Sequence, residues 1–282
     1  MTGQATLVSQ APAWAHAPQG PQRIVCLTEE TTEWLYMLGQ EHRIVGISGY
    51  TVRPARARQE KPRVSAFTSA KLDKILALEP DCVLGFSDMQ ADIASSLVRA
   101  GVQVTIFNQR SVAGIVDMLF QLAAMVGQLE VGRGLIQKMQ QDLQDIQELA
   151  ANFPRRPRVF FEEWDEPHIS AIQWVSELMG IAGGDDIFPE LATQSLGKHR
   201  IIADGVEIVS RNPDIIIGSW CGKKFRAEKV AARPGWQDVP AVKTGQLFEI
   251  KSADILQPGP AALTDGVEQM HRIVREWMVA HG

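Results

Sequence analysis

The segment SWCGKKF (219–225) brings an indole, a thiol, two cations and a phenyl ring together directly after an apolar run. A short apolar run that stops at a glycine is typical of a buried strand, so this segment is predicted to be the loop at the strand's carboxyl end. Trp220 and Phe225 offer aromatic surface, whereas Lys223 and Lys224 offer donors and charge for carboxylate, amide or phosphate groups. The pattern predicts one wall of a binding cleft, with core packing of the aromatic residues as the alternative.

Cys221 and His168 are the residues most suited to metal binding or nucleophilic chemistry. A neighbouring lysine lowers a thiol pKa, whereas a lone cysteine without a His–Asp partner is usually inert. His168 could be an axial ligand to cobalt or iron, or a hydrogen-bonded loop histidine. An enzyme would combine them with Glu162 and Glu163, but no nucleophile, base and orienting group are visibly assembled. The sequence also has no G-x-S-x-G elbow and no phosphate-binding glycine loop, so we predict that the protein is not an enzyme.

The run EEWDE (162–166) places four carboxylates around Trp164 at the end of a predicted strand. These carboxylates could ligate a hard metal or serve as acid and base. They could also pair with Lys223, Lys224 or Arg200 across a cleft. We favour this last interpretation, in which the ion pairs hold two lobes together.

Two further carboxylates, Glu29 and Glu30, begin a predicted helix. Acidic residues at this position complement the positive end of the helix dipole, which is a sufficient structural reason for them. Thr28, directly before them, is the expected N-cap.

Strand and helix patterns alternate from residue 23 onward. The expected strands are 23–27, 43–48, 81–86, 102–107, 158–164, 214–220 and 246–250, and the expected helices are 29–38, 72–80, 91–101, 112–150, 172–179, 205–213 and 264–281. Such alternation is typical of parallel sheets with helices on both faces. The predicted fold class is therefore α/β, with two Rossmann-like lobes of parallel sheets joined by a long α-helix.

The boundaries follow from the same pattern. We expect a disordered leader at 1–22, an N-terminal lobe at 23–110, a connecting helix at 111–153 and a C-terminal lobe at 154–282. Gly127 and Gly134 could kink or split the connecting helix. Ligands of open α/β sheets bind beyond the carboxyl ends of the strands, so two such lobes should enclose a cleft. Its expected lining segments are 28–32, 48–53, 86–89, 162–168 and 219–225.

Composition excludes several classes of partner. The 282 residues carry a net charge of -5 with no long basic run, which argues against nucleic acid. No apolar stretch approaches the ~20 residues that cross a bilayer. Three widely spaced cysteines predict neither a disulfide framework nor paired zinc ligands. We expect a monomer that binds a small molecule.

Several motifs resemble one known family: RIVCLTEETTEWLYMLG (23–39), RIVGISGY (43–50), KPRVSAFTSAKLDKILALEPDCVLGF (61–86) and NPDIIIG (212–218). The chain is similar, over about residues 22–280, to the substrate-binding proteins of ABC importers for vitamin B12, haem and ferric siderophores, and looks closest to the cobalamin-binding branch. The resemblance implies two α/β lobes joined by one long helix, no intrinsic cofactor, and a corrinoid ligand delivered to a permease.

The resemblance also implies site residues. Tyr50, Phe67 and Phe86 match positions at which the N-terminal lobe stacks aromatic rings on the corrin. In the C-terminal lobe the chain departs from the pattern, because His168 stands where an aromatic residue is expected and Arg200 where a tryptophan is expected.

Three aromatic residues could replace that second aromatic surface, namely Trp164, Trp220 and Phe225. For docking on the permease, Asp73 matches the carboxylate of the first lobe and Glu207 lies one residue from that of the second, although both could be ordinary surface acids.

The compartment has two interpretations. The resemblance implies the periplasm or the outer face of a membrane, whereas residues 1–22 lack a signal-like apolar core, which indicates the cytoplasm if Met1 is the native start. In the second case the same cleft would serve a cytoplasmic cofactor carrier or sensor. A siderophore or haem is the alternative ligand.

Overall fold

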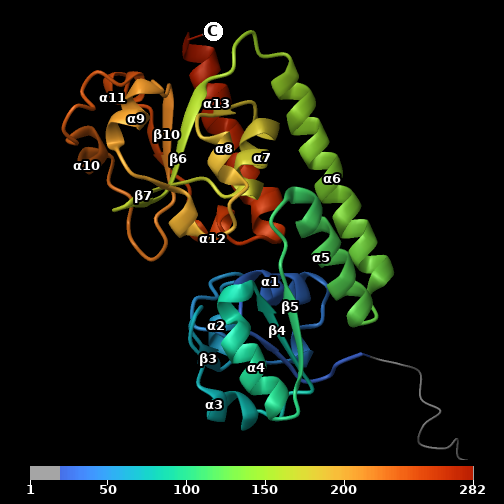
Figure 1. The fold of residues 1–282 in the computed structure, drawn as a ribbon. Coiled ribbons are helices and arrows are strands. Elements are labelled where there is room, and N and C mark those ends of the chain that lie inside the picture. The colour runs from blue at the N-terminus through green and yellow to red at the C-terminus, as the bar shows by residue number, and fades with distance from the viewer. Residues whose placement is uncertain (1–19, 282) are drawn as a thin grey trace, which may run out of the picture.

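The computed structural model describes residues 20–281 of the chain (Figure 1). Residues 1–19 of the expected leader lie outside the described residues, while residues 20–22 contact the first lobe. There the Gln22 amide donates to Asp81 Oδ2 over 2.6 Å, and Arg43 Nη1 donates to the carbonyl of Pro21 over 2.9 Å. Within residues 20–281 no helix has the length and apolar character of a membrane span.

The N-terminal lobe is a parallel sheet with helices on both faces, as predicted. Its strand order is β3-β2-β1-β4-β5. The strands are β1 (Ile24–Cys26), β2 (Ile44–Ser48), β3 (Arg63–Ser65), β4 (Cys82–Phe86) and β5 (Gln103–Phe107), and the helices are α1 (Glu29–Met37), α2 (Ala57–Glu60), α3 (Leu72–Leu76) and α4 (Ala91–Arg99), with 3-10 turns at Glu41–Arg43 and Asp88–Gln90. Successive side chains of a strand point to opposite faces, and here both faces are covered, so all three residues of β1 are buried.

The connecting stretch forms two helices, α5 (Val112–Met125) and α6 (Leu129–Ala151), and therefore differs from one continuous helix. The break falls at Gly127, whose φ of +72° is a left-handed conformation that favours glycine. Gly134 lies inside α6 and does not interrupt it. A Cβ placed on Gly132, near the start of α6, would lie 3.6 Å from side-chain atoms of Trp34 in the first lobe. The far end of α6 packs on α7 and α13 of the second lobe, so this helix bridges both lobes (Figure 1).

The C-terminal lobe contains a mixed sheet in the order β11-β10-β6-β7-β9, with β8 pairing β6. Its strands are β6 (Arg158–Asp165), β7 (His168–Ser170), β8 (Asp185–Asp186), β9 (Ile201–Ile202), β10 (Ile215–Gly218) and β11 (Leu247–Glu249). Its helices are α7 (Gln173–Ala182), α8 (Pro189–Ala192), α9 (Gly205–Ser210), α10 (Ala227–Ala231), α11 (Pro240–Lys243), α12 (Ser252–Ile255) and α13 (Val267–His281), with a 3-10 turn at Gly197–His199 and a π-helical turn at Ala262–Gly266.

The second sheet departs from the expected parallel arrangement at one edge. Strand β6 continues to Asp165 and turns back through residues 166–167 into β7, which pairs with it antiparallel. The segment expected as the cleft loop 162–168 is therefore mostly a β-hairpin. Strands β10 and β11 pair parallel to β6, as the strand–helix alternation predicts.

Three hydrophobic clusters hold these layers together. One continuous cluster runs from the inner face of the first sheet through α5 and α6 to α7 and α13, and smaller clusters cover the outer face of each sheet. The lobes are thus joined by packed helices, and the carboxyl ends of their parallel strands face one another. The predicted fold class, two α/β lobes with a long connecting helix, is confirmed.

Candidate ligand-binding cleft

Two cavities lie between the lobes at the carboxyl ends of the strands. The first, of about 230 Å³, is lined by Thr28, Glu29, Ser48, Tyr50, Phe67, Cys221, Gly222 and Gln257. The second, of about 200 Å³, is lined by sixteen residues, among them Phe86, Arg110, Glu163, Trp174 and Arg200. Phe67, Cys221 and Gln257 line both cavities, so the two spaces share a wall. This is the place where open α/β sheets bind ligands.

The N-terminal lobe supplies the aromatic surface of this cleft. Tyr50 follows β2 and is 54% exposed, Phe67 follows β3 and is half-buried, and Phe86 ends β4 and is buried. Gln90 Nε2 donates to the carbonyl of Phe67 over 2.9 Å, which fixes the loop that carries this ring. The structure therefore brings together all three aromatic residues that the family resemblance singled out.

The C-terminal lobe contributes Trp174 and a neutralised ion pair. Arg200, 1% exposed, lies bidentate on Glu163, with Nη1 2.6 Å from Oε2 and Nη2 3.1 Å from Oε1. Its guanidinium also donates to the carbonyls of Ser170 and Gln194, which satisfies most of its donors. Arg200 is thus a fixed part of the wall. The buried indole of Trp174 donates to a backbone carbonyl over 2.9 Å and forms the apolar part of the same wall.

Arg110, which follows β5, is a second guanidinium on the cleft wall. Its Cζ lies 4.7 Å above the centre of the Phe86 ring, a cation–π arrangement. The nearest carboxylate, Asp88, is 3.6 Å away, and Nε is buried without a hydrogen-bond partner among the residues described. Burial lowers the pKa of this guanidinium, which nevertheless stays charged because an arginine pKa is ordinarily above 12. Arg110 is suited to an acidic or carbonyl group of a ligand.

Cys221 lines both cavities, but it is not an activated thiol. Burial raises the pKa of this thiol, and the charges of Glu29 and Glu163 act in the same direction. The expectation that a neighbouring lysine favours the thiolate is wrong, since Lys223 is bound to Asp165, with Nζ 2.6 Å from Oδ1. Cys221 is therefore a small apolar element of the cleft wall.

Glu29 and Glu30 are buried where α1 meets the second lobe. A Cβ on Gly259 of that lobe would lie 2.4 Å from Cβ of Glu30, which shows how closely the two segments pack. Burial raises the pKa of Glu29 to about 8 and that of Glu30 to about 7, and the charge of Glu30 adds to the effect on Glu29. Thr28 does not cap the helix with its side chain, because its Oγ1 donates to Glu30 Oε1 over 2.6 Å. Complementing the helix dipole is therefore not the only role of Glu29 and Glu30, because both are also buried in the contact between the lobes.

Several predicted site residues lie away from both cavities. Glu162, fully buried, is held by Arg233 (2.8 and 2.9 Å), by Nδ1 of His168 (2.8 Å) and by the indole of Trp220 (3.0 Å). His168 is further packed beside Trp236, with ring centres 5.7 Å apart. This network fixes His168 inside the second lobe, so it does not face the cleft as an axial ligand would.

The remaining residues of the opening motif also belong to the second lobe's own packing. Trp220 and Phe225 are buried with ring centres 4.9 Å apart, and a Cβ on Gly218 would lie 2.0 Å from a ring atom of Phe225. Lys223 lies 5.1 Å from the ring centres of Trp164 and Trp220, and Lys224 is exposed.

The acids of EEWDE (162–166) do form ion pairs, but these lie within one lobe and not across the cleft. Its acids pair with Arg200, Lys223 and Arg233, which all belong to the C-terminal lobe. The expected pairing of these acids across the lobes is therefore wrong. The reason is the hairpin, which folds the acids back onto their own sheet.

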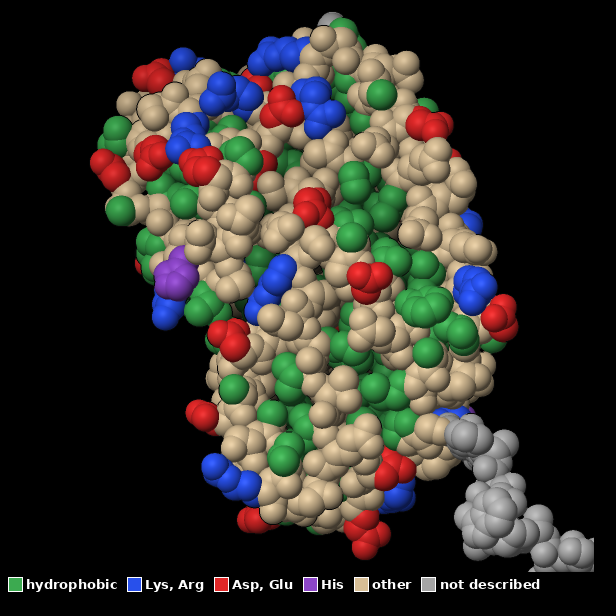
Figure 2. All heavy atoms as spheres, turned by 45° about the vertical axis from the view of Figure 1, so that its right-hand side comes forward, with side chains coloured by type: hydrophobic (Ala, Val, Ile, Leu, Met, Phe, Trp, Pro, Cys, Tyr) green, Lys and Arg blue, Asp and Glu red, His purple; other side chains and the backbone are tan. Residues whose placement is uncertain are grey.

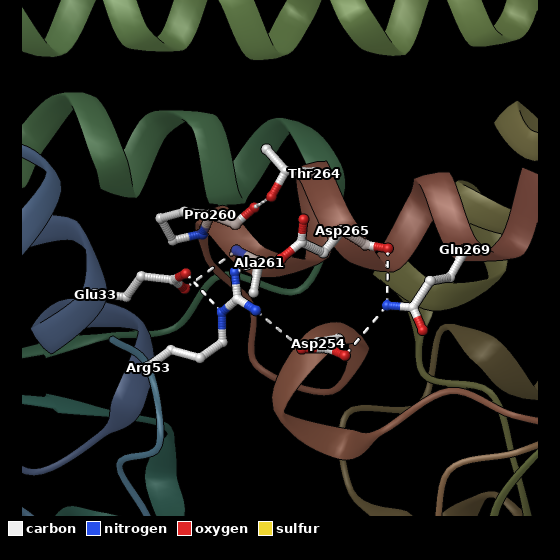
Figure 3. A network of polar contacts seen from close by, with 8 residues as sticks. All are labelled: Glu33, Arg53, Asp254, Pro260, Ala261, Thr264, Asp265 and Gln269. Carbon is white, nitrogen blue, oxygen red and sulfur yellow. Dashed lines mark hydrogen bonds and ion pairs between the residues drawn. The ribbon is translucent and has the colours of Figure 1, made fainter. Parts of the chain in front are cut away.

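The ion pairs that do cross between the lobes come from Arg53 (Figure 3). Its guanidinium reaches Asp254 over 3.1 Å and Asp265 over 2.6 Å in the second lobe, and it is oriented by Glu33 over 2.8 Å in the first. Glu33 in turn accepts the backbone amide of Ala261 over 3.2 Å. We call these five residues the Arg53 cluster. Gln109 Nε2 also donates across the interface, to the carbonyl of Pro258 over 2.9 Å.

Surface features outside the cleft are less specific. A larger hollow of about 830 Å³ lies along α5 and α6, apart from the two cavities. On the face shown in Figure 2 acidic and basic side chains are interspersed, while hydrophobic side chains gather along the middle. Asp73 on α3 and Glu207 on α9 are exposed, and Glu207 Oε1 lies 2.5 Å from Arg211.

Comparison with known proteins identifies the family of this chain. Residues 24–253 match the periplasmic binding protein family, and the chain belongs to that family. It is 25% identical over 259 residues to an uncharacterized ABC transporter substrate-binding lipoprotein, YvrC, of Bacillus subtilis, covering 89% of this chain and 79% of that one. It is also 25% identical over 273 residues to the vitamin B12-binding protein of Vibrio cholerae, covering 94% and 93%.

Solved structures agree with this fold. The periplasmic heme-binding protein BhuT, in complex with two hemes, superposes with a TM-score of 0.77 at 21% identity, covering 91% of this chain and 98% of that one. The resemblance inferred from the sequence motifs is thereby confirmed at the level of family and fold.

Proposed function

We propose that this protein binds a corrinoid or a related metal-chelate cofactor between its lobes and delivers it to an ABC importer, without chemical change. The observation that carries the proposal is the shared wall of Phe67, Cys221 and Gln257, which joins the two cavities into one cleft formed by both lobes. Tyr50 and Phe86 extend this wall with flat apolar surface suited to a macrocycle. The relatives of the chain include a vitamin B12-binding protein, which supports the same class of ligand.

The size of the cavities indicates that binding requires lobe separation. Pockets for drug-sized ligands measure about 300–1,000 Å³. The two cavities, of about 230 and 200 Å³, reach only the lower part of this range even when taken together, and a corrinoid is larger than a drug-sized ligand. A macrocycle therefore needs the interface that contains the Arg53 cluster to open. Ligand binding and lobe geometry are coupled in this proposal.

A titration of the protein with cyanocobalamin, cobinamide, haem and a ferric siderophore tests the ligand class. Tryptophan fluorescence reports binding through Trp174, which lines the second cavity, and equilibrium dialysis gives an independent affinity. Phe67→Ala should weaken corrinoid binding by roughly 10- to 100-fold, the value of one buried aromatic side chain. Trp164→Phe is the matched control, because Trp164 lines neither cavity. No saturable binding of any of the four compounds would refute the proposal.

Haem is a second candidate ligand because of Arg110. Its buried Nε has no partner among the described residues, and a guanidinium of this kind suits a carboxylate such as a haem propionate. Arg110→Met should then weaken haem binding much more than corrinoid binding. Equal losses for both ligands would favour the corrinoid.

We further propose that the protein acts as a monomer and docks on a permease through Asp73 and Glu207. Both acids are exposed, one on each lobe, so they can contact a partner without changing the cleft. Charge reversal at both positions should abolish uptake in a reconstituted importer while ligand affinity stays unchanged. Unimpaired uptake would show that these residues are ordinary surface acids.

A further inference from the structure

Glu29 is the one acid of the first cavity, and its carboxylate is incompletely paired. The residue is 8% exposed and lines the cavity wall. The backbone of Val52 hydrogen-bonds the carboxyl group, but Oε2 is buried without a partner among residues 20–281. An unpaired buried polar atom is costly, so a ligand group that satisfies it gains affinity.

The surroundings of Glu29 determine its charge state. Glu30 and Glu33 lie on the same helix and disfavour the ionised form, Arg58 on α2 favours it only weakly, and the thiol of Cys221 faces it from the second lobe. Burial is the largest influence, and together they raise the pKa of Glu29 to about 8. At neutral pH the group is therefore mostly a neutral carboxylic acid, which can donate one hydrogen bond and accept others.

A neutral carboxylic acid selects a partner that donates and accepts side by side. A primary amide does so, because its N–H and C=O can form two parallel hydrogen bonds with the O–H and C=O of the acid. An ammonium group offers only donors and favours the ionised form, so Glu29 would first have to release its proton to the solvent. The nearby rings of Tyr50 and Phe67 offer the apolar contact that the rest of such a side chain needs.

We propose that the first cavity is the subsite for a primary amide of the ligand, held by Glu29 through paired hydrogen bonds. This assignment rests on the proposed function, since a corrinoid ring carries primary amides around its edge. It adds a specificity element: the first lobe recognises the amide through Glu29, while the aromatic residues hold the ring.

The test measures the affinity for cyanocobalamin between pH 6 and pH 9 by equilibrium dialysis, for the unchanged protein, Glu29→Gln, Glu29→Ala and the control Glu130→Gln, an exposed acid on α6. The unchanged protein should lose affinity above pH 8, by about tenfold at pH 9, because ionised Glu29 no longer donates. Glu29→Gln should bind as well as the unchanged protein at pH 6 and show no such loss, since an amide side chain donates at every pH. Glu29→Ala should bind at least about tenfold more weakly at pH 6.

Three other outcomes of this experiment would each lead to a different conclusion. The same pH dependence in Glu29→Gln as in the unchanged protein would overturn the amide subsite and leave the proposed function standing. An affinity that rises with pH would also overturn it, because ionised Glu29 would then act only as a hydrogen-bond acceptor. No binding of cyanocobalamin by any variant would overturn the corrinoid as ligand and the subsite with it.

Discussion

The Arg53 cluster is predicted to set the balance between closed and open lobes (Figure 3). Replacing Arg53 with methionine keeps the aliphatic stem and removes both ion pairs across the interface. Asp254 is 21% exposed and Asp265 50% exposed, with Arg53 itself at 29%, so each pair is worth only about 0.2–1 kcal/mol. The closed form should lose about 0.4–2 kcal/mol in total, which is roughly a 2- to 30-fold shift towards the open form.

Hydrogen exchange of the Ala261 amide measures this shift directly. That amide is bonded to Glu33 across the interface and is protected only while the lobes are closed. Arg53→Met should accelerate its exchange by the same factor of roughly 2 to 30, and small-angle scattering should show a larger radius of gyration. Arg56→Met is the matched control, because Arg56 pairs with Glu41 and Glu60 inside the first lobe. Unchanged exchange at Ala261 in Arg53→Met would refute the assignment of these pairs as the interlobe contact.

Three further predictions concern stability and reactivity. Because burial raises the pKa values of Glu29 and Glu30 above their unfolded values, the folded chain holds protons that the unfolded chain releases. The contribution of these two groups to the free energy of unfolding should be largest below about pH 4.5 and should fall as the pH rises to about 8. In urea unfolding, Glu29→Gln should show a flatter pH profile of this free energy than the unchanged protein, and the two profiles should differ by up to roughly 5 kcal/mol. Removing Arg200 leaves Glu163 without its bidentate partner in the second lobe, so Arg200→Met should cost about 3–5 kcal/mol by calorimetry, and a smaller loss would show that the site relaxes. Cys221 should react slowly with iodoacetamide at pH 7, faster at higher pH, and more slowly when ligand fills the cleft; fast alkylation at pH 7 would contradict its raised pKa.

The sequence was informative wherever a pattern is local. Apolar runs located seven of the eleven strands among residues 20–281, and the glycine at 127 marked the break between α5 and α6 through its left-handed φ. The short strands β3, β7, β8 and β9 were missed. The edge of the second sheet was not predictable in this way, because an apolar run such as 159–161 specifies a strand, but not whether the following segment returns antiparallel through a two-residue turn.

The cleft shows the same division between local and non-local signals. The expected lining segments were 28–32, 48–53, 86–89, 162–168 and 219–225, and at least one residue of each lines a cavity. The polar contacts between the two lobes were not predictable, because they depend on packing between segments more than 100 residues apart. Arg53 and Asp254 are 201 residues apart and no sequence feature links them, so the ion pairs between the lobes were assigned to the wrong acids. For Arg110 and Trp174 a signal existed, since each closely follows a strand end.

The charges of the cleft also explain why opening and recognition belong together. The second lobe neutralises Glu163 with Arg200 and Asp165 with Lys223 before any ligand arrives, so its wall is fixed and nearly uncharged. Of the described residues that line the two cavities, Glu29 and Arg110 each keep one buried side-chain atom without a hydrogen-bond partner, and both lie on the first lobe. A ligand that satisfies them first would bind to that lobe alone. Closure would then regain the stabilisation of the Arg53 ion pairs, about 0.4–2 kcal/mol. This order predicts that Arg53→Met slows closure over a bound ligand and speeds its release, with little change in the rate of first contact. Stopped-flow fluorescence of Trp174 separates these rates, and an effect confined to the association rate would contradict it.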